Sequence, residues 1–335
     1  MEHHETSTYE PYIVSAQVGS VYLSARLCLF LDAAVLAEVS PEALTPSRVR
    51  QFLAALEALL CRMDAVVGRA PPVTHAYRGR QVVEVAHLPG AAGLAHHGRA
   101  GFAVGPAFLR ESLLSFDADS APFIHHVFGY EAFRNYIAPE VFTPPYKYSC
   151  LEGEECWGWW NQGLVNIVAC LLLSDAPSGS VGFSYFGHSS AAFRAGMEAH
   201  LLVYLARRHG VACGAGDARA CLAFEDAFLH ERLPWAPHQS LDNLYSGILS
   251  VLFRAHGGAQ FLAGLFACTP HLHARLPAGV RDVRTAGENI FLACSVGARR
   301  SLAPFFEGLG FVLSAEAKGL VDALIAVSCP GGGEG

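Results

Sequence analysis

The chain has 335 residues, a formal net charge of −7 and a hydrophobic fraction of 52%, while Asp, Glu, Lys and Arg together make up only 16%. A composition that is this apolar and this poor in charge excludes intrinsic disorder. The mildly acidic balance argues against a nucleic-acid-binding protein, which would carry clustered Lys and Arg. The longest apolar runs, residues 27–36 and 165–173, are shorter than the roughly 20 residues that span a bilayer, so we expect a large buried core and no membrane partner.

The N-terminus and the cysteines indicate the cellular compartment. Residues 1–11 are polar and acidic and do not resemble a secretory signal. The ten cysteines are scattered, mostly in apolar surroundings, and no Cys-x-x-Cys pair occurs. We therefore expect a cytoplasmic protein with reduced core cysteines and without a cysteine zinc site, although Cys150 and Cys156 flank an acidic loop and could pair.

The first half of the chain mixes strand and helix patterns. Thr45-Pro46-Ser47 resembles a helix start, because a capping residue precedes a proline at the first helical position. The apolar residues that follow recur at helical spacing up to Gly68. In chain order, the patterns predict strands at 12–15 and 21–24, an apolar run at 27–36, a helix at 49–67, a strand at 81–86, a glycine-rich hairpin at 94–105 and a helix at 123–137.

The second half is predicted to be helical. A Pro- and aromatic-rich loop over 143–157 separates it from the first half, and Gly or Pro clusters separate its segments. The expected helices cover residues 161–173, 190–209, 241–256, 260–268, 285–297 and 315–327. The predicted fold class is α+β, with an α+β N-terminal subdomain over 1–140 and a mostly helical C-terminal subdomain over 141–330 that closes a cleft.

This order of elements, over roughly residues 45–315, resembles the zincin metallopeptidases of the gluzincin type. In that superfamily a helix precedes a small sheet, an edge strand lies along the cleft, and an active-site helix carries His-Glu-x-x-His. The resemblance implies that residues 94–105 contain the edge strand and that 123–137 form the active-site helix. It also implies that segments such as Pro304-Phe305-Phe306 belong to the helices that close the cleft.

The metal-binding motif is degenerate. No His-Glu-x-x-His occurs, and in the register of the resemblance Tyr130 and Arg134 occupy the two histidine positions, while Glu131 keeps the position of the general base. Gln162 occupies the position of the third ligand, a glutamate. A phenol, a guanidinium and an amide do not supply the imidazole, carboxylate or thiolate ligands that zinc requires. We therefore expect no zinc at this site and no other cofactor.

The same residues suggest a metal-independent site. Tyr130 and Arg134 lie four apart on one helix face, and Glu131 can pair with Arg134. The arginine can hold a carboxylate or a developing oxyanion, Glu131 can move a proton and Tyr130 can donate one. Without the resemblance, Glu131 and Arg134 would be read as an ordinary intrahelical ion pair.

Further candidates come from histidines and aromatic residues. His97 lies in the expected edge strand and His188 follows an aromatic cluster between residues 142 and 186 that includes Trp160; we expect His97, His188, Trp160, Arg134 and Gln162 to bind substrate. The cluster is typical of core packing or of a pocket wall. A displaced metal site built on His126, which falls on the same helix stripe as Tyr130 and Arg134, is the alternative that requires zinc.

Three functions remain open. The first is a metallopeptidase-like protein repurposed as a metal-independent enzyme. Glu131 and Tyr130 would be catalytic, and the reaction would be the hydrolysis, cyclisation or isomerisation of a small-molecule or peptide-like substrate. The second is a non-catalytic pseudo-peptidase that binds a peptide along its edge strand. The third is a zinc hydrolase with shifted ligands.

Overall fold

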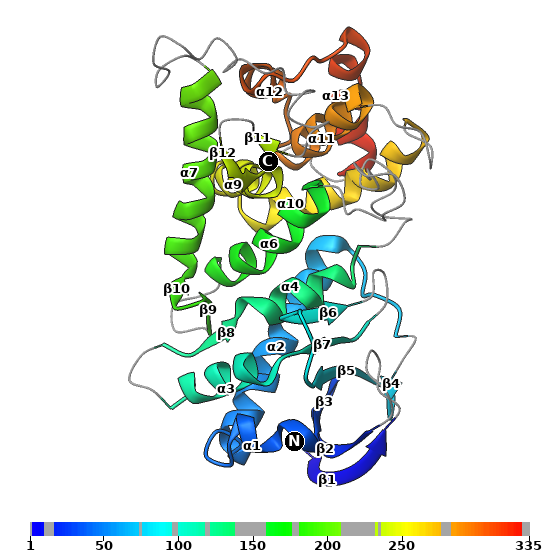
Figure 1. The fold of residues 1–335 in the computed structure, drawn as a ribbon. Coiled ribbons are helices and arrows are strands. Elements are labelled where there is room, and N and C mark those ends of the chain that lie inside the picture. Colours follow the sequence, from blue (N-terminus) through cyan, green and yellow to red (C-terminus); the bar gives the residue numbers. More distant parts are fainter. Residues whose placement is uncertain are drawn as a thin grey trace. The chain divides into compact units, whose positions relative to one another are not determined.

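A computed structural model describes residues 2–9, 17–73, 76–95, 100–117, 121–137, 159–175, 181–208, 232–233, 236–275 and 283–329. The side chains of some residues in these ranges, among them Trp160 and Gln162, are not described. Sheets and helices mix in the first half of the chain, and the second half is chiefly helical, which confirms the predicted α+β class (Figure 1).

The chain divides into two compact units. The first comprises Met1–Ala65, Arg69–Ala138 and Val168–Phe193. The second comprises Val66–Gly68, Pro139–Ile167 and Arg194–Gly335. The first unit thus takes in residues 168–193, which the sequence pattern assigned to the C-terminal half.

The main sheet of the first unit is mixed. In order it contains β1 (Glu2–Tyr9), β2 (Gln17–Leu23), β3 (Leu27–Asp32), β5 (Arg80–Val85), β7 (Phe102–Val104) and β6 (Gly93–Ala95), and β4 (Ala76–Tyr77) pairs with β5. Strands β3, β5 and β7 are parallel, while β6 runs antiparallel to β7 at the end of this order. The hairpin predicted at 94–105 is therefore present as β6 and β7.

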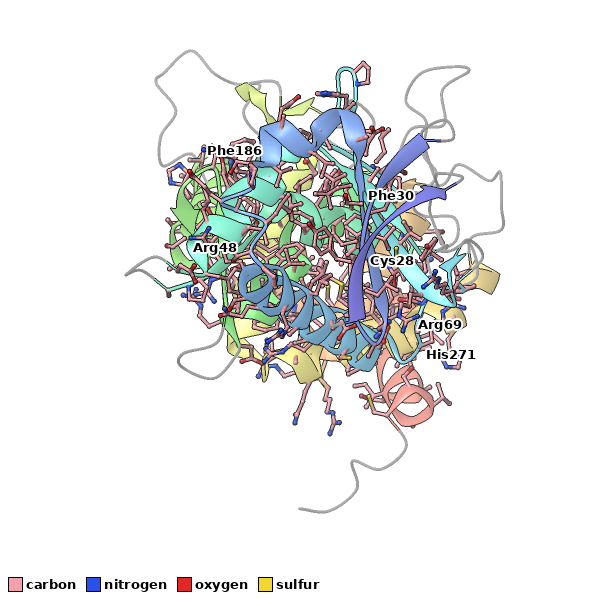
Figure 2. The ribbon with its side chains drawn as sticks, turned by 90° about the horizontal axis from the view of Figure 1, so that it is seen from below. Cys28, Phe30, Arg48, Arg69, Phe186 and His271 are labelled. Atoms are coloured by element: carbon pink, nitrogen blue, oxygen red, sulfur yellow. The ribbon has the colours of Figure 1, made fainter. Side chains whose placement is uncertain are left out.

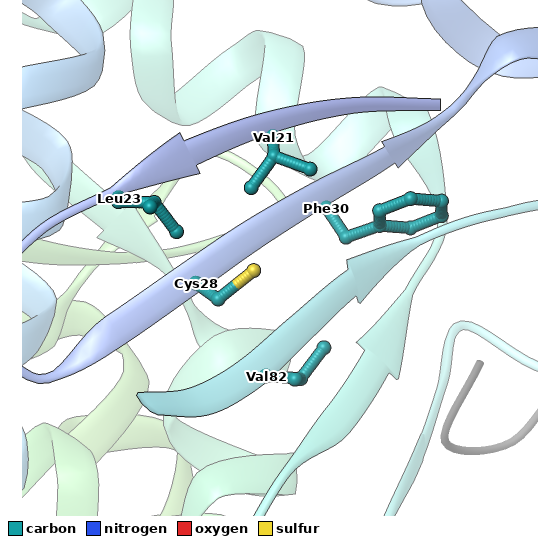
Figure 3. Packing of buried hydrophobic residues seen from close by; sticks show 5 residues of the cluster. All are labelled: Val21, Leu23, Cys28, Phe30 and Val82. Carbon is teal, nitrogen blue, oxygen red and sulfur yellow. The ribbon is translucent and has the colours of Figure 1, made fainter. Parts of the chain in front are cut away.

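Alternation along the strands builds a buried apolar cluster on one face of this sheet. Successive side chains of a strand point to opposite faces, so Cys28 and Phe30, which are two residues apart, share a face of β3 (both are labelled in Figure 2). They pack with Val21, Leu23 and Val82 from the neighbouring strands (Figure 3). The side chain of Cys28 is buried in this cluster, as the sequence predicted for the core cysteines.

Helix α2 (Pro46–Val67) anchors the first unit. It begins where the Thr45-Pro46 pair predicts, and the Thr45 hydroxyl accepts a hydrogen bond from the backbone N–H of Arg48. Its apolar stripe is fully buried: Phe52, Leu53, Leu56, Leu59, Leu60 and Met63. The Tyr136 hydroxyl contacts this helix, donating a hydrogen bond to Asp64 Oδ1 over 2.6 Å.

The expected helix over 123–137 is shorter than predicted, because its first three residues form a strand. β8 (Phe123–His125) pairs in parallel with β9 (Gly182–Tyr185), which pairs antiparallel with β10 (His188–Ser189). Helix α4 (His126–Arg134) follows at once. The strand is held by α3 (Pro106–Ser115), whose Ser112 and Ser115 hydroxyls accept hydrogen bonds from the N–H groups of His125 and Phe123.

The remaining helices with residues in the first unit are short or extend beyond that unit. The 3₁₀ turn Ala33–Val35 and α1 (Leu36–Val39) follow β3. Helices α6 (Trp159–Ser174) and α7 (Ser190–Arg208) each begin in one unit and end in the other. The expected strand at 12–15 lies outside the described residues.

The second unit contains a helical array and one hairpin. The hairpin is β11 (Arg232–Leu233) with β12 (Ala236–Ser240). The helices are α9 (Leu241–Ala255), α10 (Ala259–Cys268), the 3₁₀ turn Thr269–Arg275, α11 (Val283–Gly297), α12 (Ala303–Leu309) and α13 (Ala315–Ser328). Within the described stretches, no single helix has both the length and the apolar composition to cross a membrane; α9 and α10 meet that criterion only as a pair, with a bend of 118° between them.

A candidate acid/base pocket

The first unit contains a pocket of about 320 Å³ built around α4. Its walls come from β6, α3, β8, α4 and the turn between β9 and β10. The lining residues are Ala92, Gly93, Phe108, His125, His126, Val127, Tyr130, Glu131, Arg134, Tyr185 and Phe186. Three residues of the degenerate motif, Tyr130, Glu131 and Arg134, are thus brought together in one cavity.

The ends of α4 are fixed by side-chain hydrogen bonds. At its start, His125 Nδ1 accepts a hydrogen bond from the Val127 N–H, which caps the helix. Burial lowers the pKa of His125 to about 4, so the ring is neutral and able to accept this bond. Just past the end of the helix, the Asn135 side chain bonds the Gly101 backbone and the Gln81 side chain of the main sheet. Both ends are therefore tied to neighbouring strands.

The face of α4 opposite the pocket is apolar. Phe128 packs edge-to-face against Phe52 of α2, with 4.9 Å between ring centroids. Gly129 lies so close to Ala169 of α6 that a side chain at position 129 would collide with it. This tight packing turns the polar face of the helix, with Glu131 and Arg134, toward the pocket and β6.

Glu131 is the central group of the pocket. Its side chain is only 3% exposed, and its Oε2 accepts a hydrogen bond of 3.1 Å from Arg134 Nη1. Burial raises the pKa of Glu131 from an ordinary 4.5 to about 7, although the charge and the hydrogen bond of Arg134 act in the opposite direction. A carboxyl group with this pKa exchanges its proton near neutral pH.

Gly93 of β6 makes room for this carboxyl group. A Cβ atom at position 93 would lie 2.6 Å from Cγ of Glu131 and 2.9 Å from its Oε1. Strand β6 and helix α4 therefore meet at these two residues. The sequence alone did not single out Gly93, because the contact joins residues 38 positions apart.

Arg134 and Tyr130 complete the polar part of the pocket. The Arg134 guanidinium lies 5.9 Å from the centroid of the Tyr130 ring, within the range of a cation–π contact. The Arg134 side chain is 18% exposed and is one of the residues that line the pocket. Both residues lie on the face of α4 that the spacing predicted.

The rest of the pocket is aromatic. His126 is buried among four rings and lies 5.5 Å from Tyr130 and 5.0 Å from Tyr185 between centroids. Phe108 contacts the His125 ring at 4.6 Å. Of these wall residues, the sequence indicated Tyr185 and Phe186 through the aromatic cluster, whereas Phe108 lies in a helix that carries no chemical motif.

Of the other predicted substrate-binding residues, His188 does not join this group: it lies in β10, is exposed and is not among the lining residues. The side chains of Gln162 and Trp160, at the start of α6, and the whole of His97 lie outside what the structure describes.

The donor set of the pocket does not fit zinc. Beside Glu131 the pocket offers the phenol of Tyr130 and the guanidinium of Arg134, which are not the ligands that zinc prefers, and the guanidinium is ion-paired with Glu131, the one buried carboxylate on α4. In the described parts of the chain, no group of three or more His, Cys, Asp or Glu side chains is arranged to hold a metal ion. Of the described residues that line the pocket, His125, His126 and Glu131 are of a metal-binding type. The Nδ1 atom of His125 already accepts the hydrogen bond that caps α4.

Comparison with known proteins gives the fold alone. No family model and no curated protein matches the chain. Two solved structures are similar, with TM-scores of 0.51 and 0.50 at 12% and 11% identity; both are of a functionally unknown conserved protein from Bacillus anthracis str. Ames, one of them a mutant. Each covers 94% of this chain, and this chain spans 52% of each.

Proposed function

We propose that this chain is a metal-independent enzyme in which Glu131 acts as an acid/base group on a small-molecule or peptide-like substrate. The observation that carries the proposal is a carboxyl group that is buried in the wall of a pocket, has a pKa of about 7 and is hydrogen-bonded to an arginine. A proton donor and acceptor works best when its pKa lies near the working pH.

The three polar residues divide the chemistry between them. Ionised Glu131 removes a proton from water or from the substrate, and Arg134 stabilises negative charge that develops on a substrate oxygen. Tyr130 donates its hydroxyl proton to a leaving or rearranging group, and the proton held by Glu131 passes back to the phenolate through solvent, which restores both groups. Hydrolysis, cyclisation and isomerisation each need only these transfers, and none requires an electron acceptor.

The proposed ancestry of the site is a zincin-like scaffold. Two features support it: β6 is antiparallel and ends the strand order, and α4 packs its Glu131 against Gly93 of that strand. In this proposal Arg134 supplies, as a fixed cation, the positive charge that a metal ion supplies in the metallopeptidases.

The alternative of a non-catalytic peptide-binding protein uses the same pocket. It is favoured by Gly93, which places backbone of the terminal strand in the pocket wall, where an extended peptide can add to the sheet. This alternative gives Glu131 no proton to transfer.

Substitution of Glu131 tests the proposal. Wild-type protein is incubated with a panel of amides, esters and lactams, and turnover is followed by mass spectrometry. We expect Glu131→Gln to lower turnover by about 100-fold or more, because the amide cannot take up a proton. The control is Glu38→Gln, which removes a half-exposed carboxylate outside the pocket and should leave turnover unchanged. Unchanged turnover in Glu131→Gln contradicts the proposal.

A further inference from the structure

The turn between β9 and β10 holds Phe186 in an unusual backbone conformation. Tyr185 pairs with His188, so Phe186 and Gly187 are the two central residues of a tight hairpin turn. Their φ angles are +46° and +84°. Two-residue turns of this hand favour Asn-Gly, and a positive φ is an outlier for a bulky side chain such as Phe. The turn alone therefore does not explain an aromatic residue at position 186.

Burial does not explain it either. The Phe186 ring is 63% exposed, although it is one of the residues that line the pocket (labelled in Figure 2). It contacts the rings of Tyr185 at 4.9 Å and His125 at 5.3 Å, both edge-to-face, and Phe108 lies 6.3 Å away. The ring thus extends the aromatic wall outward while most of its surface stays open.

The lining of the pocket is consequently of two chemical kinds. Its polar part is Glu131, which offers a hydrogen-bond acceptor, with Arg134 beside it as a donor. Its aromatic part includes Phe108, Tyr185 and Phe186, which offer ring faces and edges. An amide carries one donor and one acceptor, which match the polar part, and a flat ring packs on the aromatic part better than a puckered one.

We infer that Phe186 is a specificity-determining residue whose ring packs on a flat apolar group of the ligand, next to an amide-like group at Glu131 and Arg134. This inference rests on the proposed function, since it names the class of compound on which that pocket acts. The strained backbone is retained because it holds the ring against the bound group.

The test compares two neutral probes of similar size, 4-fluorobenzamide, which is flat, and 4-fluorocyclohexanecarboxamide, which is puckered. Their dissociation constants are measured by ¹⁹F NMR line broadening with the full chain. We expect the wild type to bind the flat probe about fivefold or more tightly than the puckered one. Phe186→Gly should bring the two constants within about twofold of each other, because it removes the ring. Glycine also suits the positive φ, so this variant keeps the turn.

Two further variants complete the experiment. Leu202→Ala removes another exposed apolar side chain, outside the pocket, and should keep the wild-type preference. Phe186→Trp keeps a flat ring and should also keep it. The inference is overturned if the wild type binds neither probe, if it does not distinguish them, or if Phe186→Gly keeps the wild-type ratio.

The outcome is separable from the fate of the proposed function. If Glu131→Gln keeps full turnover while Phe186→Gly abolishes the preference, the proposed acid/base role fails and the ligand class stands. If Glu131→Gln is inactive while Phe186→Gly keeps the preference, the ligand class fails and the acid/base role stands.

Discussion

The contact between Gly93 and Glu131 shows how one missing side chain shapes the site. Gly93 faces Glu131 from the edge strand, and no other residue leaves space for the carboxyl group there. Val127 also approaches position 93, at 2.9 Å from a Cβ placed on it, so a larger residue meets both the carboxyl group and the aliphatic side chain. The glycine is thus needed for a close approach and not for an unusual backbone angle.

Gly93→Ala tests this at the residue scale. We expect it to lower the free energy of unfolding by about 1–3 kcal/mol, because a methyl group is forced into a filled site. Gly196→Ala, in α7, is the matched control: nothing lies within 4 Å of its Cβ position, and the change should raise stability by about 0.5–1 kcal/mol. Urea unfolding measures both. Equal effects of the two substitutions would contradict the packing described for Gly93.

At the scale of the helix, α4 depends on a neutral histidine cap. The pKa of His125 is lowered by burial from 6.5 to about 4. The unfolded chain therefore binds a proton below pH 6.5 that the folded chain does not, and this group makes the protein less stable as the pH falls from 6.5 to 4. Glu131 acts in the opposite sense, because its raised pKa favours the folded state on protonation below pH 7.

His125→Asn separates these two contributions. Asn caps helices without titrating, so the variant should lose less stability than the wild type between pH 6.5 and 4, while Glu131 contributes equally to both proteins. Denaturant unfolding at several pH values measures the difference. If the free energies of unfolding of the two proteins change in parallel between pH 6.5 and 4, the buried His125 ring does not cause the loss of stability at low pH.

The same region shows where sequence patterns succeed and where they fail. The spacing of Glu131 and Arg134 predicted their ion pair, because residues three apart on a helix are neighbours whatever surrounds them. The pattern placed the helix start at Phe123, whereas the strand β8 forms there because β9, some 60 residues later, supplies its hydrogen bonds. The contact of Gly93 with Glu131 and the position of Phe186 likewise depend on distant residues, which local periodicity does not report.

At the scale of the whole molecule, the low content of charged residues goes with extensive burial of apolar side chains. The described strands and helices bury long apolar stripes, and one of the few charged groups inside the first unit is the carboxyl group of Glu131. The α+β class and the helical second half could be predicted from these stripes and from the Gly and Pro separators. The similarity to the two Bacillus anthracis structures concerns the fold, at 12% and 11% identity.

The metal content of the whole protein tests the expectation that the pocket holds no zinc. We expect elemental analysis of protein purified without added metal to find zinc well below one atom per chain, and chelation to leave turnover unchanged, because Tyr130 and Arg134 are not zinc ligands. One zinc per chain that is lost in His126→Ala would contradict this expectation and favour a hydrolase with shifted ligands.

The most direct test of the central claim is the titration of the Glu131 carboxyl group itself. In protein labelled with ¹³C at the glutamate side-chain carboxyls, NMR should show a resonance with a pKa of about 7 that is absent from Glu131→Gln. Arg134→Gln should raise this pKa further, since Arg134 lowers it in the wild type. If the resonance that Glu131→Gln removes titrates near the ordinary 4.5, Glu131 is not poised to transfer protons at neutral pH and the proposed mechanism is wrong.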